Sequence, residues 1–233
     1  MPPHSSRPDD AADNHGRDLG HDRDLGGVRE EYRRASLDVG DVDAHPLRQL
    51  AAWIDDALAA GLADASAMVL ATTDAQGCPR ARTVLCKGLT ATAVEFYTNL
   101  ASQKGRDLAA HPCAAAVFLW TSLERQVTLR GAVAPVPEAE ADAYFAARPR
   151  GSQLGAWASR QSEPVPDRAA LDAALAEAEV RFAGAAVPRP PFWGGFALTP
   201  SEVEVWQGRP DRLHDRLRYT QRTDGWDLQR LSP

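Results

Sequence analysis

The 233-residue sequence has no long hydrophobic run, and its basic residues do not outnumber its acidic ones. A membrane-spanning helix needs about 20 consecutive apolar residues, and the N-terminus also lacks the apolar segment of a secretory signal peptide. Lys and Arg total 26 and Asp and Glu total 32, which gives a net charge of −6. Nucleic-acid-binding surfaces usually carry a basic excess. The sequence therefore favours a cytoplasmic protein that binds neither a membrane nor a nucleic acid.

Cysteine is scarce and shows no ligand pattern. The three cysteines form no CxxC pair, and their odd number argues against a disulfide framework. Three of the six histidines lie within the first 27 residues, but their spacing fits no standard metal-ligand pattern. We therefore expect no metal site.

Lysine is nearly absent, because Lys87 and Lys104 are the only lysines among the 26 basic residues. A genome that favours arginine codons accounts for most of this bias. An ammonium and a guanidinium are not interchangeable at a shaped site, so both lysines are candidate functional residues. Glycine-rich loops of the GxGxxG or Walker type are absent as well, which disfavours a Rossmann or P-loop nucleotide site.

Residues 1–27 differ in composition from the rest of the chain. They hold six Asp and three Arg and almost no large apolar side chain. Such a segment cannot bury enough surface to offset the entropy lost on ordering, so the sequence predicts a disordered tail. Hydrophobic residues make up 44% of the whole chain, enough for one folded domain over residues 28–233.

Apolar periodicity predicts many short strands and a few helices. A first helix is expected over residues 46–60, with Asp43 as a nearby cap and a buried face formed by Leu47, Leu50, Ile54 and Leu58. A hairpin is expected over residues 67–73 and 79–89. Further strands are expected over residues 94–98, 114–120, 126–133, 192–198, 203–206, 213–219 and 226–230, and further helices over 102–110, 138–147 and 168–182. This pattern predicts a mainly β fold with α additions, arranged as a β-barrel with helices outside it.

Two basic clusters lie near the ends of these elements. Arg82 and Lys87 fall on opposite faces of one predicted strand, where ordinary solvent exposure is the simpler interpretation. Ser102 and Lys104 open a predicted helix just after a tyrosine and a threonine. A helix N-terminus with a lysine in its first turn can bind a phosphate, although Ser102 can also act only as the helix cap.

A third cluster combines Tyr144, Arg148 and Ser152. The first two are four residues apart and share a helical face, and the serine follows the predicted helix end. A phenol, a guanidinium and a hydroxyl all donate hydrogen bonds to oxygen, as a phosphate site requires. The alternative is that these residues form an ordinary exposed helix terminus with no ligand.

The fourth cluster is the most crowded. If Leu213 points into the core, then Arg212, His214 and Arg216 project together from the other face of one strand. Such like charges repel unless an anion or nearby acids neutralise them. Neighbouring aspartates can neutralise these charges, and the cluster is then only a set of ion pairs. The more specific interpretation is that the cluster binds an anionic ligand.

Taken together, the clusters predict two phosphate sites and no protein nucleophile, paired acids or metal ligands. That combination suits a reaction carried by a cofactor, which the protein binds and orients. The residues by themselves do not identify the cofactor.

The same segments resemble the pyridoxine/pyridoxamine 5′-phosphate oxidases, and the likeness extends from Val28 to Pro233. The stretches that carry it are residues 29–32, 82–87, 96–100, 123–127, 148–157, 161–162, 192–196, 206–216 and 230–233. The resemblance implies an FMN-binding split β-barrel that works as a homodimer, with FMN at the subunit interface.

The resemblance also assigns roles residue by residue. The implied FMN-binding residues are Arg82, Thr83, Val84, Leu85, Cys86, Lys87, Tyr97, Thr98, Lys104, Gln126, Gln161, Ser162, Trp206 and Arg216. The implied substrate-binding residues are Arg29, Tyr32, Lys87, Tyr144, Arg148, Ser152, Arg212 and His214. Of these, Arg212 and His214 are the implied catalytic residues, and Arg29 and Tyr32 belong to an implied mobile lid.

The implied reaction oxidises pyridoxine or pyridoxamine 5′-phosphate to pyridoxal 5′-phosphate by hydride transfer to the flavin, and oxygen is then reduced to hydrogen peroxide. The alternatives are a split-barrel flavin or deazaflavin reductase, and a non-catalytic carrier of FMN or pyridoxal phosphate. The sequence departs from the family at Glu30, where an arginine is common, and at Gln103, where a basic residue is common. We hypothesise that Arg106, one turn later, supplies the missing charge.

Overall fold

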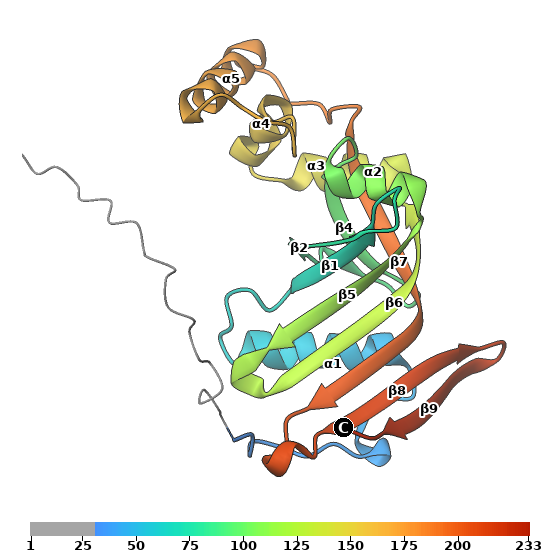
Figure 1. The fold of residues 1–233 in the computed structure, drawn as a ribbon. Coiled ribbons are helices and arrows are strands. Elements are labelled where there is room, and N and C mark those ends of the chain that lie inside the picture. Colours follow the sequence, from blue (N-terminus) through green and yellow to red (C-terminus); the bar gives the residue numbers. More distant parts are fainter. Residues whose placement is uncertain (1–30) are drawn as a thin grey trace, which may run out of the picture. The chain divides into compact units, whose positions relative to one another are not determined.

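An antiparallel sheet of nine strands forms the frame of the part of the chain that the structure describes (Figure 1). The structure is a computed structural model in which residues 31–233 are described, and Tyr32–Pro233 form one unit. The predicted tail over residues 1–27, the lid residue Arg29 and the departure at Glu30 lie outside the described residues. Neighbouring strands follow the order β2-β1-β5-β6-β7-β4-β3, with β8 added to β7 and β9 to β8.

The elements have the following bounds. The strands are β1 (Ala67–Thr73), β2 (Pro79–Leu85), β3 (Gly88–Leu89), β4 (Val94–Asn99), β5 (Cys113–Trp120), β6 (Arg125–Pro135), β7 (Trp193–Gln207), β8 (Asp215–Arg222) and β9 (Gly225–Leu231). The helices are α1 (Pro46–Ala59), α2 (Gln103–Ala110), α3 (Glu138–Ala147), α4 (Arg150–Ala158) and α5 (Arg168–Arg181). Short 3-10 turns occur at Val39–Asp41, Thr121–Leu123 and Pro210–Arg212.

The sheet curls into a half-barrel, and its two longest strands, β6 and β7, carry the bend (Figure 1). Their register shifts between Arg130 and Gly131. A β-bulge of this kind bends a strand and increases its twist. A Cβ on Gly131 would lie only 1.9 Å from the Thr199 carbonyl oxygen, so glycine permits the close approach of the two strands. The predicted mainly β fold with α additions is confirmed.

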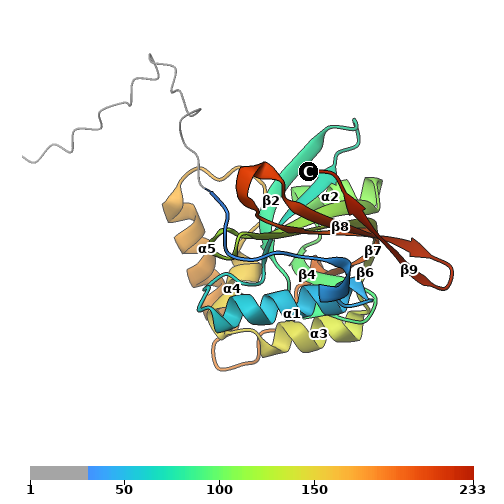
Figure 2. The same cartoon turned by 90° about the horizontal axis from the view of Figure 1, so that it is seen from below.

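Helix α1 packs on one face of the sheet and completes the main core (Figure 2). The predicted helix is confirmed, but its buried face is Leu47, Leu50, Trp53 and Ala57, whereas Leu58 is 58% exposed. The expected cap was also wrong. The His45 side chain accepts the hydrogen bond from the Leu47 N–H, while Asp43 accepts from the backbone N–H of His45.

Helices α3, α4 and α5 contribute to a second, smaller core around Phe145, Leu154, Phe182 and Trp193. The sequence prediction missed α4, because residues 150–158 contain few large apolar side chains and follow Pro149. Proline is well suited to the start of a helix, since its missing N–H has no partner there in any case. Figure 1 shows α4 and α5 together at the end of the molecule away from the β8–β9 hairpin.

Three strand predictions need correction. The second hairpin strand ends at Leu85 rather than continuing to residue 89. The strands expected at 192–198 and 203–206 are one continuous strand, β7. The strand expected over residues 213–219 begins at Asp215, after a 3-10 turn. Leu213 is 69% exposed instead of buried. The assumption that Leu213 points into the core was therefore wrong.

Candidate functional site

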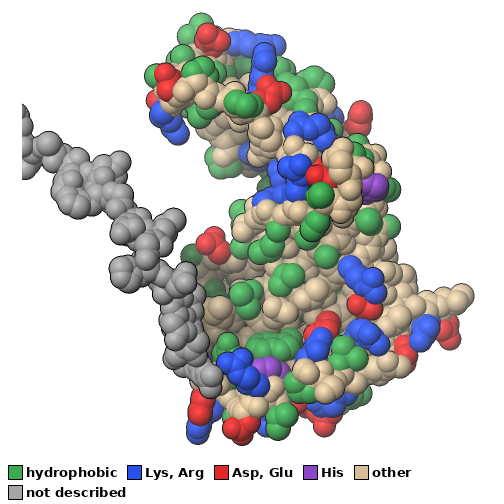
Figure 3. Space-filling view, viewed as in Figure 1, with side chains coloured by type: hydrophobic (Ala, Val, Ile, Leu, Met, Phe, Trp, Pro, Cys, Tyr) green, Lys and Arg blue, Asp and Glu red, His purple; other side chains and the backbone are tan. Residues whose placement is uncertain are grey.

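A cavity of about 780 Å³ opens between strands β2 and β4 and helices α2 and α4. Figure 3 shows the surface hollowed between the α4–α5 region and the sheet, with basic side chains gathered at the border. Most of the predicted site residues line this cavity: Arg82, Thr83, Val84, Leu85, Lys87, Tyr97, Thr98, Lys104, Tyr144, Arg148, Ser152, Gln161 and Ser162. The first three sequence clusters therefore meet in one place.

The cavity combines Arg82 and Lys87 because the chain changes direction between them. Strand β2 ends at Leu85. The Cys86 N–H still donates to the Ser66 carbonyl, next to the first residue of β1, whereas the Lys87 N–H donates to the Glu95 carbonyl on β4, both at 2.8 Å. The prediction that the two cations lie on opposite faces of one strand was wrong, since both line the cavity.

Cys86 itself does not line the cavity. It is buried in the main core, and its Sγ contacts the Gly88 carbonyl oxygen at 3.3 Å. Burial raises the pKa of the Cys86 thiol to about 11. Because the thiolate is the nucleophilic form of cysteine, this side chain is an unreactive part of the core.

Lys104 is a buried cation whose hydrogen-bond partners among residues 31–233 are all neutral. Its Nζ donates to Thr98 Oγ1 at 3.1 Å, to Gln161 Oε1 at 3.1 Å and to Ser102 Oγ at 3.4 Å. Burial lowers the pKa of Lys104, and the neighbouring charge of Arg82 lowers it further. The charge of Asp107 acts in the opposite direction but forms no direct ion pair with Lys104 in the described chain. A buried charge without a direct ion pair is costly, so this ammonium group favours an anion at the cavity wall.

The start of α2 beside Lys104 is held by two serines. Ser102 caps the helix by accepting from the Gly105 N–H, as the simpler interpretation of that cluster predicted. The backbone N–H of Gln103 donates to Ser162 Oγ at 3.1 Å. Ser162 has a φ of 76°, a left-handed conformation that is uncommon outside glycine. The loop that carries Gln161 and Ser162 is therefore fastened to the N-terminus of α2.

A stack of three aromatic rings forms another wall of the cavity. Tyr97 stacks on Tyr144 with 4.0 Å between ring centroids and on Trp193 with 5.7 Å. The guanidinium carbon of Arg148 lies 4.8 Å from the Trp193 ring centroid. Arg148 Nη1 is buried and has no hydrogen-bond partner in the described part of the chain. Arg148 lines the cavity, and a buried polar atom without a partner is one that a bound anionic ligand can satisfy.

Tyr144, Arg148 and Ser152 meet at this wall, although their local structure differs from the prediction. Arg148 is the C-terminal cap of α3 with extended backbone, and Ser152 belongs to the first turn of α4 rather than to a loop. The sharp turn between the two helices directs all three side chains to the same cavity.

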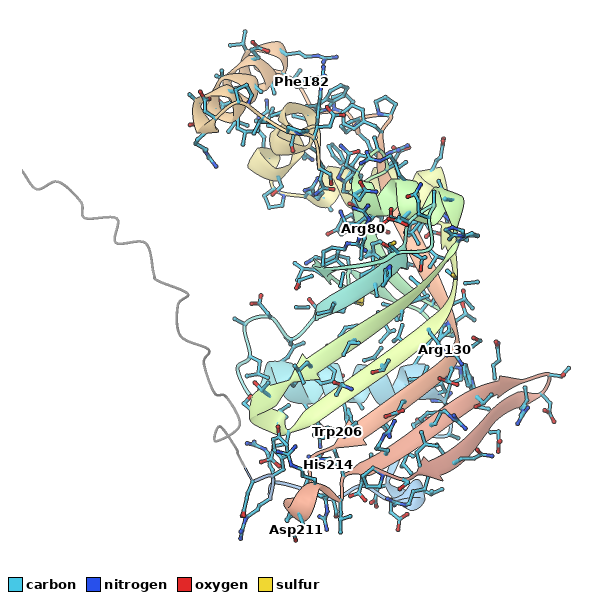
Figure 4. All side chains as sticks on the ribbon, in the orientation of Figure 1. Arg80, Arg130, Phe182, Trp206, Asp211 and His214 are labelled. Carbon is cyan, nitrogen blue, oxygen red and sulfur yellow. The ribbon has the colours of Figure 1, made fainter. Side chains whose placement is uncertain are left out.

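The remaining predicted residues lie at the other end of the sheet. Trp206 and His214 have ring centroids 4.7 Å apart, and the Tyr32 ring packs edge-on against both at 5.7 Å. Gln126 joins Tyr32 and Trp206 in lining a smaller cavity of about 320 Å³. Figure 4 shows Trp206 and His214 far along the sheet from Arg80, which lies on β2.

The local contacts of His214 determine the charge of its ring and which ring nitrogen carries the proton. Its Nδ1 accepts a hydrogen bond from the Arg209 backbone N–H at 3.1 Å, which leaves the proton of a neutral imidazole on Nε2. Burial lowers the pKa of His214, and the charge of Arg212 lowers it further, while Asp215 acts in the opposite direction. The ring is therefore a neutral hydrogen-bond donor at pH 7.

The crowded arginines of this cluster are only partly neutralised. Arg216 forms a two-point ion pair with Glu204, at 2.8 and 2.9 Å. Asp215 pairs with Arg230 at 2.7 Å and with Arg209 at 3.5 Å. Arg212 follows a left-handed Asp211 and is itself left-handed, with φ of 61°. It has no ion pair among residues 31–233. The ion-pair interpretation therefore describes Arg216, and an anionic ligand at Arg212 stays a prediction.

Arg106, the hypothesised replacement for a basic residue at position 103, does not line the large cavity. Its guanidinium donates to the Ala101 carbonyl oxygen and to Gln103 Oε1. Arg106 therefore reaches the cavity only through Gln103, which does line it.

Sequence reasoning missed three residues that shape these two regions. Trp193 forms the base of the aromatic stack, and Asp107 is a buried carboxylate behind Arg82. The carboxylate of Glu124 accepts from the backbone N–H of Arg34 at 2.9 Å, and thereby holds the segment that carries Tyr32. A left-handed Glu124, with φ of 54°, marks this turn, but no feature of the sequence pattern signals it.

In the described part of the chain no helix is long and apolar enough to cross a membrane. Residues 31–233 also contain no group of three potential His, Cys, Asp or Glu metal ligands.

Comparison with known proteins gives consistent matches over nearly the whole described chain. Residues 54–182 match the family described as pyridoxamine 5′-phosphate oxidase, and residues 193–233 match the pyridoxine 5′-phosphate oxidase C-terminal dimerisation region. A pyridoxine/pyridoxamine 5′-phosphate oxidase of Ralstonia pickettii is 56% identical over 88% of this chain and 97% of its own length. One of Rubrobacter xylanophilus is 53% identical over 91% and 97%.

Solved structures agree on the fold. PhzG from Burkholderia lata, in complex with tetrahydrophenazine-1-carboxylic acid, is 32% identical with a TM-score of 0.79, over 85% of this chain and all of that one. A pyridoxamine 5′-phosphate oxidase-related, FMN-binding protein of Nostoc punctiforme has a TM-score of 0.64 at 18% identity, over 77% and 95%. The predicted split β-barrel is confirmed. The chain belongs to the pyridoxine/pyridoxamine 5′-phosphate oxidase family.

Proposed function

We propose that the protein oxidises pyridoxine or pyridoxamine 5′-phosphate to pyridoxal 5′-phosphate with bound FMN, and that oxygen is the electron acceptor and hydrogen peroxide the product. The observation that carries the proposal is the large cavity with two separate cationic centres. Lys104 has only neutral partners at one wall, and Arg148 has an orphaned N–H at another. A phosphorylated cofactor and a phosphorylated substrate together need two such centres.

The wall around Lys104 fits the phosphate of FMN. The buried ammonium group, the Thr98 and Ser162 hydroxyls and the Gln161 amide lie at the N-terminus of α2, where the helix dipole favours negative charge. Arg82 adds a guanidinium to the same cavity. The other proposed FMN-binding residues of this cavity are Thr83, Val84, Leu85, Lys87 and Tyr97. Buried Cys86 supports the flavin only through its backbone.

The wall around Arg148 fits the phosphate of the substrate. Arg148, Tyr144 and Ser152 line the cavity together and carry a guanidinium, a phenol and a hydroxyl as hydrogen-bond donors, and Lys87 adds a flexible cation. The stacked rings of Tyr97, Tyr144 and Trp193 give the cavity a flat apolar surface beside these donors.

The remaining proposed ligands require a second copy of the chain. Trp206 and His214 lie along the sheet from the large cavity (Figure 4), and Gln126 and Arg216 pair with Trp206 in the sheet. We therefore propose a homodimer in which this end of one protomer completes the cavity of its partner. The open face of the sheet supports this proposal, because it exposes apolar side chains. Val69, Leu85 and Leu119 are 41%, 41% and 56% exposed, and exposed apolar patches of this kind mark association surfaces.

In the proposed dimer, His214 and Arg212 contact the substrate ring. The neutral His214 imidazole presents its Nε2–H as a donor, because Nδ1 is occupied by the Arg209 N–H. Arg212, which has no ion pair among residues 31–233, adds a guanidinium to stabilise negative charge on the substrate. Tyr32 packs on His214 and Trp206 and shields this end from water, and Arg29 is proposed to extend the same lid. Bound FMN supplies the hydride acceptor, so the protein needs no nucleophile of its own.

The experiment is to purify the full chain, record its flavin spectrum and measure oxygen-dependent aldehyde formation from both phosphorylated substrates. The proposal expects a yellow protein, aldehyde formation and one hydrogen peroxide per turnover. A protein that binds FMN but forms no aldehyde with oxygen, and instead reduces a flavin or deazaflavin, would support the reductase alternative. Binding without any turnover would support a carrier, and a protein that cannot bind FMN would contradict the proposal.

A further inference from the structure

A buried carboxylate stands behind the cationic wall of the large cavity. Asp107 on α2 is only 2% exposed and does not line the cavity. Its Oδ2 accepts from Thr72 Oγ1 at 2.7 Å and contacts Arg82 Nη2 at 3.4 Å, and its Oδ1 accepts from Gln103 Nε2 at 2.9 Å. Burying a carboxylate is costly unless it is paired and hydrogen-bonded, and here every partner is a donor.

These donors keep Asp107 ionised. Burial raises the pKa of Asp107, but the hydrogen bonds from Thr72 and Gln103 and the charge of Arg82 outweigh burial, so the pKa lies below its ordinary value. The negative charge is therefore permanent at neutral pH. It faces the cations from the side that a ligand in the cavity cannot reach.

The Arg82 guanidinium is fixed by this arrangement. Its Nη1 donates to the Leu70 carbonyl oxygen at 3.1 Å and to Thr72 Oγ1 at 2.7 Å, and its Nη2 donates to Asp107. A guanidinium has five N–H donors in one rigid plane. Three hydrogen bonds to the protein leave the Nε–H and one Nη2–H without a partner in the described chain, on a residue that lines the cavity.

Thr72 connects the two charged groups. Its hydroxyl, 2% exposed, donates to Asp107 and accepts from Arg82. The threonine comes from β1, the arginine from β2 and the aspartate from α2. The hydroxyl therefore fixes the position of the β2 cation relative to the helix that also carries Lys104.

We propose that Asp107 and Thr72 are positioning residues that hold Arg82 in register with Lys104, and that this arrangement makes the cavity select a phosphorylated flavin over the unphosphorylated one. The inference rests on the proposed FMN site. Neither residue touches the ligand. Both act through Arg82, whose planar donors bind phosphate only when their orientation is fixed.

The test compares the dissociation constants of FMN and riboflavin for the flavin-free full chain, measured by quenching of flavin fluorescence. Thr72→Val and Asp107→Asn are expected to raise the FMN constant about ten-fold, the effect of losing one charge-assisted hydrogen bond. The dissociation constant of riboflavin is expected to change by no more than about two-fold, because riboflavin has no phosphate group for Arg82 to bind. Thr72→Ser keeps the hydroxyl and is expected to keep the FMN constant of the unmodified chain.

Asp74→Asn is the matched control. Asp74 is also buried, at 6% exposure, and pairs with an arginine of β2, Arg80, at 3.0 Å, but neither residue lines the cavity. This variant is expected to lower thermal stability without changing the ratio of the two constants.

Two outcomes would overturn the inference: a parallel rise of both constants in Thr72→Val, or an unchanged FMN constant in that variant. Thr72→Val keeps the test decisive if Asp107→Asn does not fold. Failure of the unmodified chain to bind either flavin would overturn the proposed function, and this assignment with it. That result can be told apart from failure of the inference alone, because it is measured on the unmodified chain.

Discussion

The ring of Tyr97 lies flat on the ring of Tyr144, with 4.0 Å between centroids and 17° between planes. Their strand and helix are brought together by Gly195 on β7, which pairs with Tyr97 in the sheet. A Cβ at Gly195 would lie 2.6 Å from the Tyr97 ring and 2.8 Å from the Val136 side chain. The flat wall of the cavity thus depends on the absence of a side chain.

Gly195→Ala is therefore expected to displace Tyr97 and disrupt the stack. Because Tyr97 lines the large cavity, we expect weaker binding of both FMN and the substrate, by about ten-fold, as overpacking costs about 1–3 kcal/mol. Flavin titration and KM measure the two effects. Gly151→Ala is the control, since a Cβ there meets nothing within 4 Å. Equal behaviour of the two variants would contradict the prediction.

Arg148→Ala is expected to affect only phosphorylated substrates. Its buried Nη1 has no partner among residues 31–233, so its loss leaves no acceptor unpaired inside the protein. KM for pyridoxine 5′-phosphate should rise about 10- to 100-fold, the effect of one or two charge-assisted hydrogen bonds, while unphosphorylated pyridoxine reacts as before. Arg181→Ala is the control, because Arg181 also lies over aromatic rings but not in the cavity. A similar loss for both substrates would argue against the phosphate role.

Glu124→Ala is expected to release the segment that carries Tyr32. The Glu124 carboxylate accepts from the backbone N–H groups of Arg33 and Arg34. We expect kcat/KM to fall about ten-fold, since the two exposed hydrogen bonds together contribute about 1–3 kcal/mol. Steady-state kinetics measure the effect. Glu163→Ala, which removes an exposed glutamate 4.0 Å from Arg160, is the control and should leave kcat/KM unchanged. If Glu124→Ala also left kcat/KM unchanged, the positioning role of Glu124 would be refuted.

The protonation of His214 gives a prediction for pH. Burial and Arg212 lower its pKa from the ordinary value of 6.5. Because the folded pKa is below the unfolded one, the stability that neutral His214 contributes is present above about 6.5 and is lost as the pH falls through the folded value. Nitrogen NMR of the imidazole should show protonated Nε2 and a midpoint below 6.5. Arg212→Ala should move the midpoint upward, and a downward shift would contradict the electrostatic cause.

Two leucines of α1 test the packing. Leu50 is fully buried and Leu58 is 58% exposed, although the helical period alone places both on one face. Leu50→Ala should lower the free energy of unfolding by about 2–5 kcal/mol, and Leu58→Ala by no more than about 0.5 kcal/mol. Denaturant unfolding measures both. Similar losses of unfolding free energy in the two variants would mean that Leu58 also belongs to the core, as the helical period alone predicts.

Local patterns account for what could be predicted. The compact apolar run over residues 67–73 and the turn after it identified the first hairpin strand with its observed bounds, because these signals act between near neighbours. The family motifs brought Lys104, Arg148 and Gln161 into the expected site. Helix α4 was missed because its sequence is weakly apolar and gains its stability from packing against α5 and Trp193.

The sequence by itself therefore determined most of the strands and helices, the family and the residue types of the site. The tertiary structure alone decided which of these residues meet. Lys104 reaches Gln161 across 57 positions and Thr72 reaches Asp107 across 35, while Trp206 and His214 lie apart from the cavity that the other site residues share. Such contacts depend on strand order and on the curl of the sheet. Both are set by the burial of the whole core, which a local pattern does not contain.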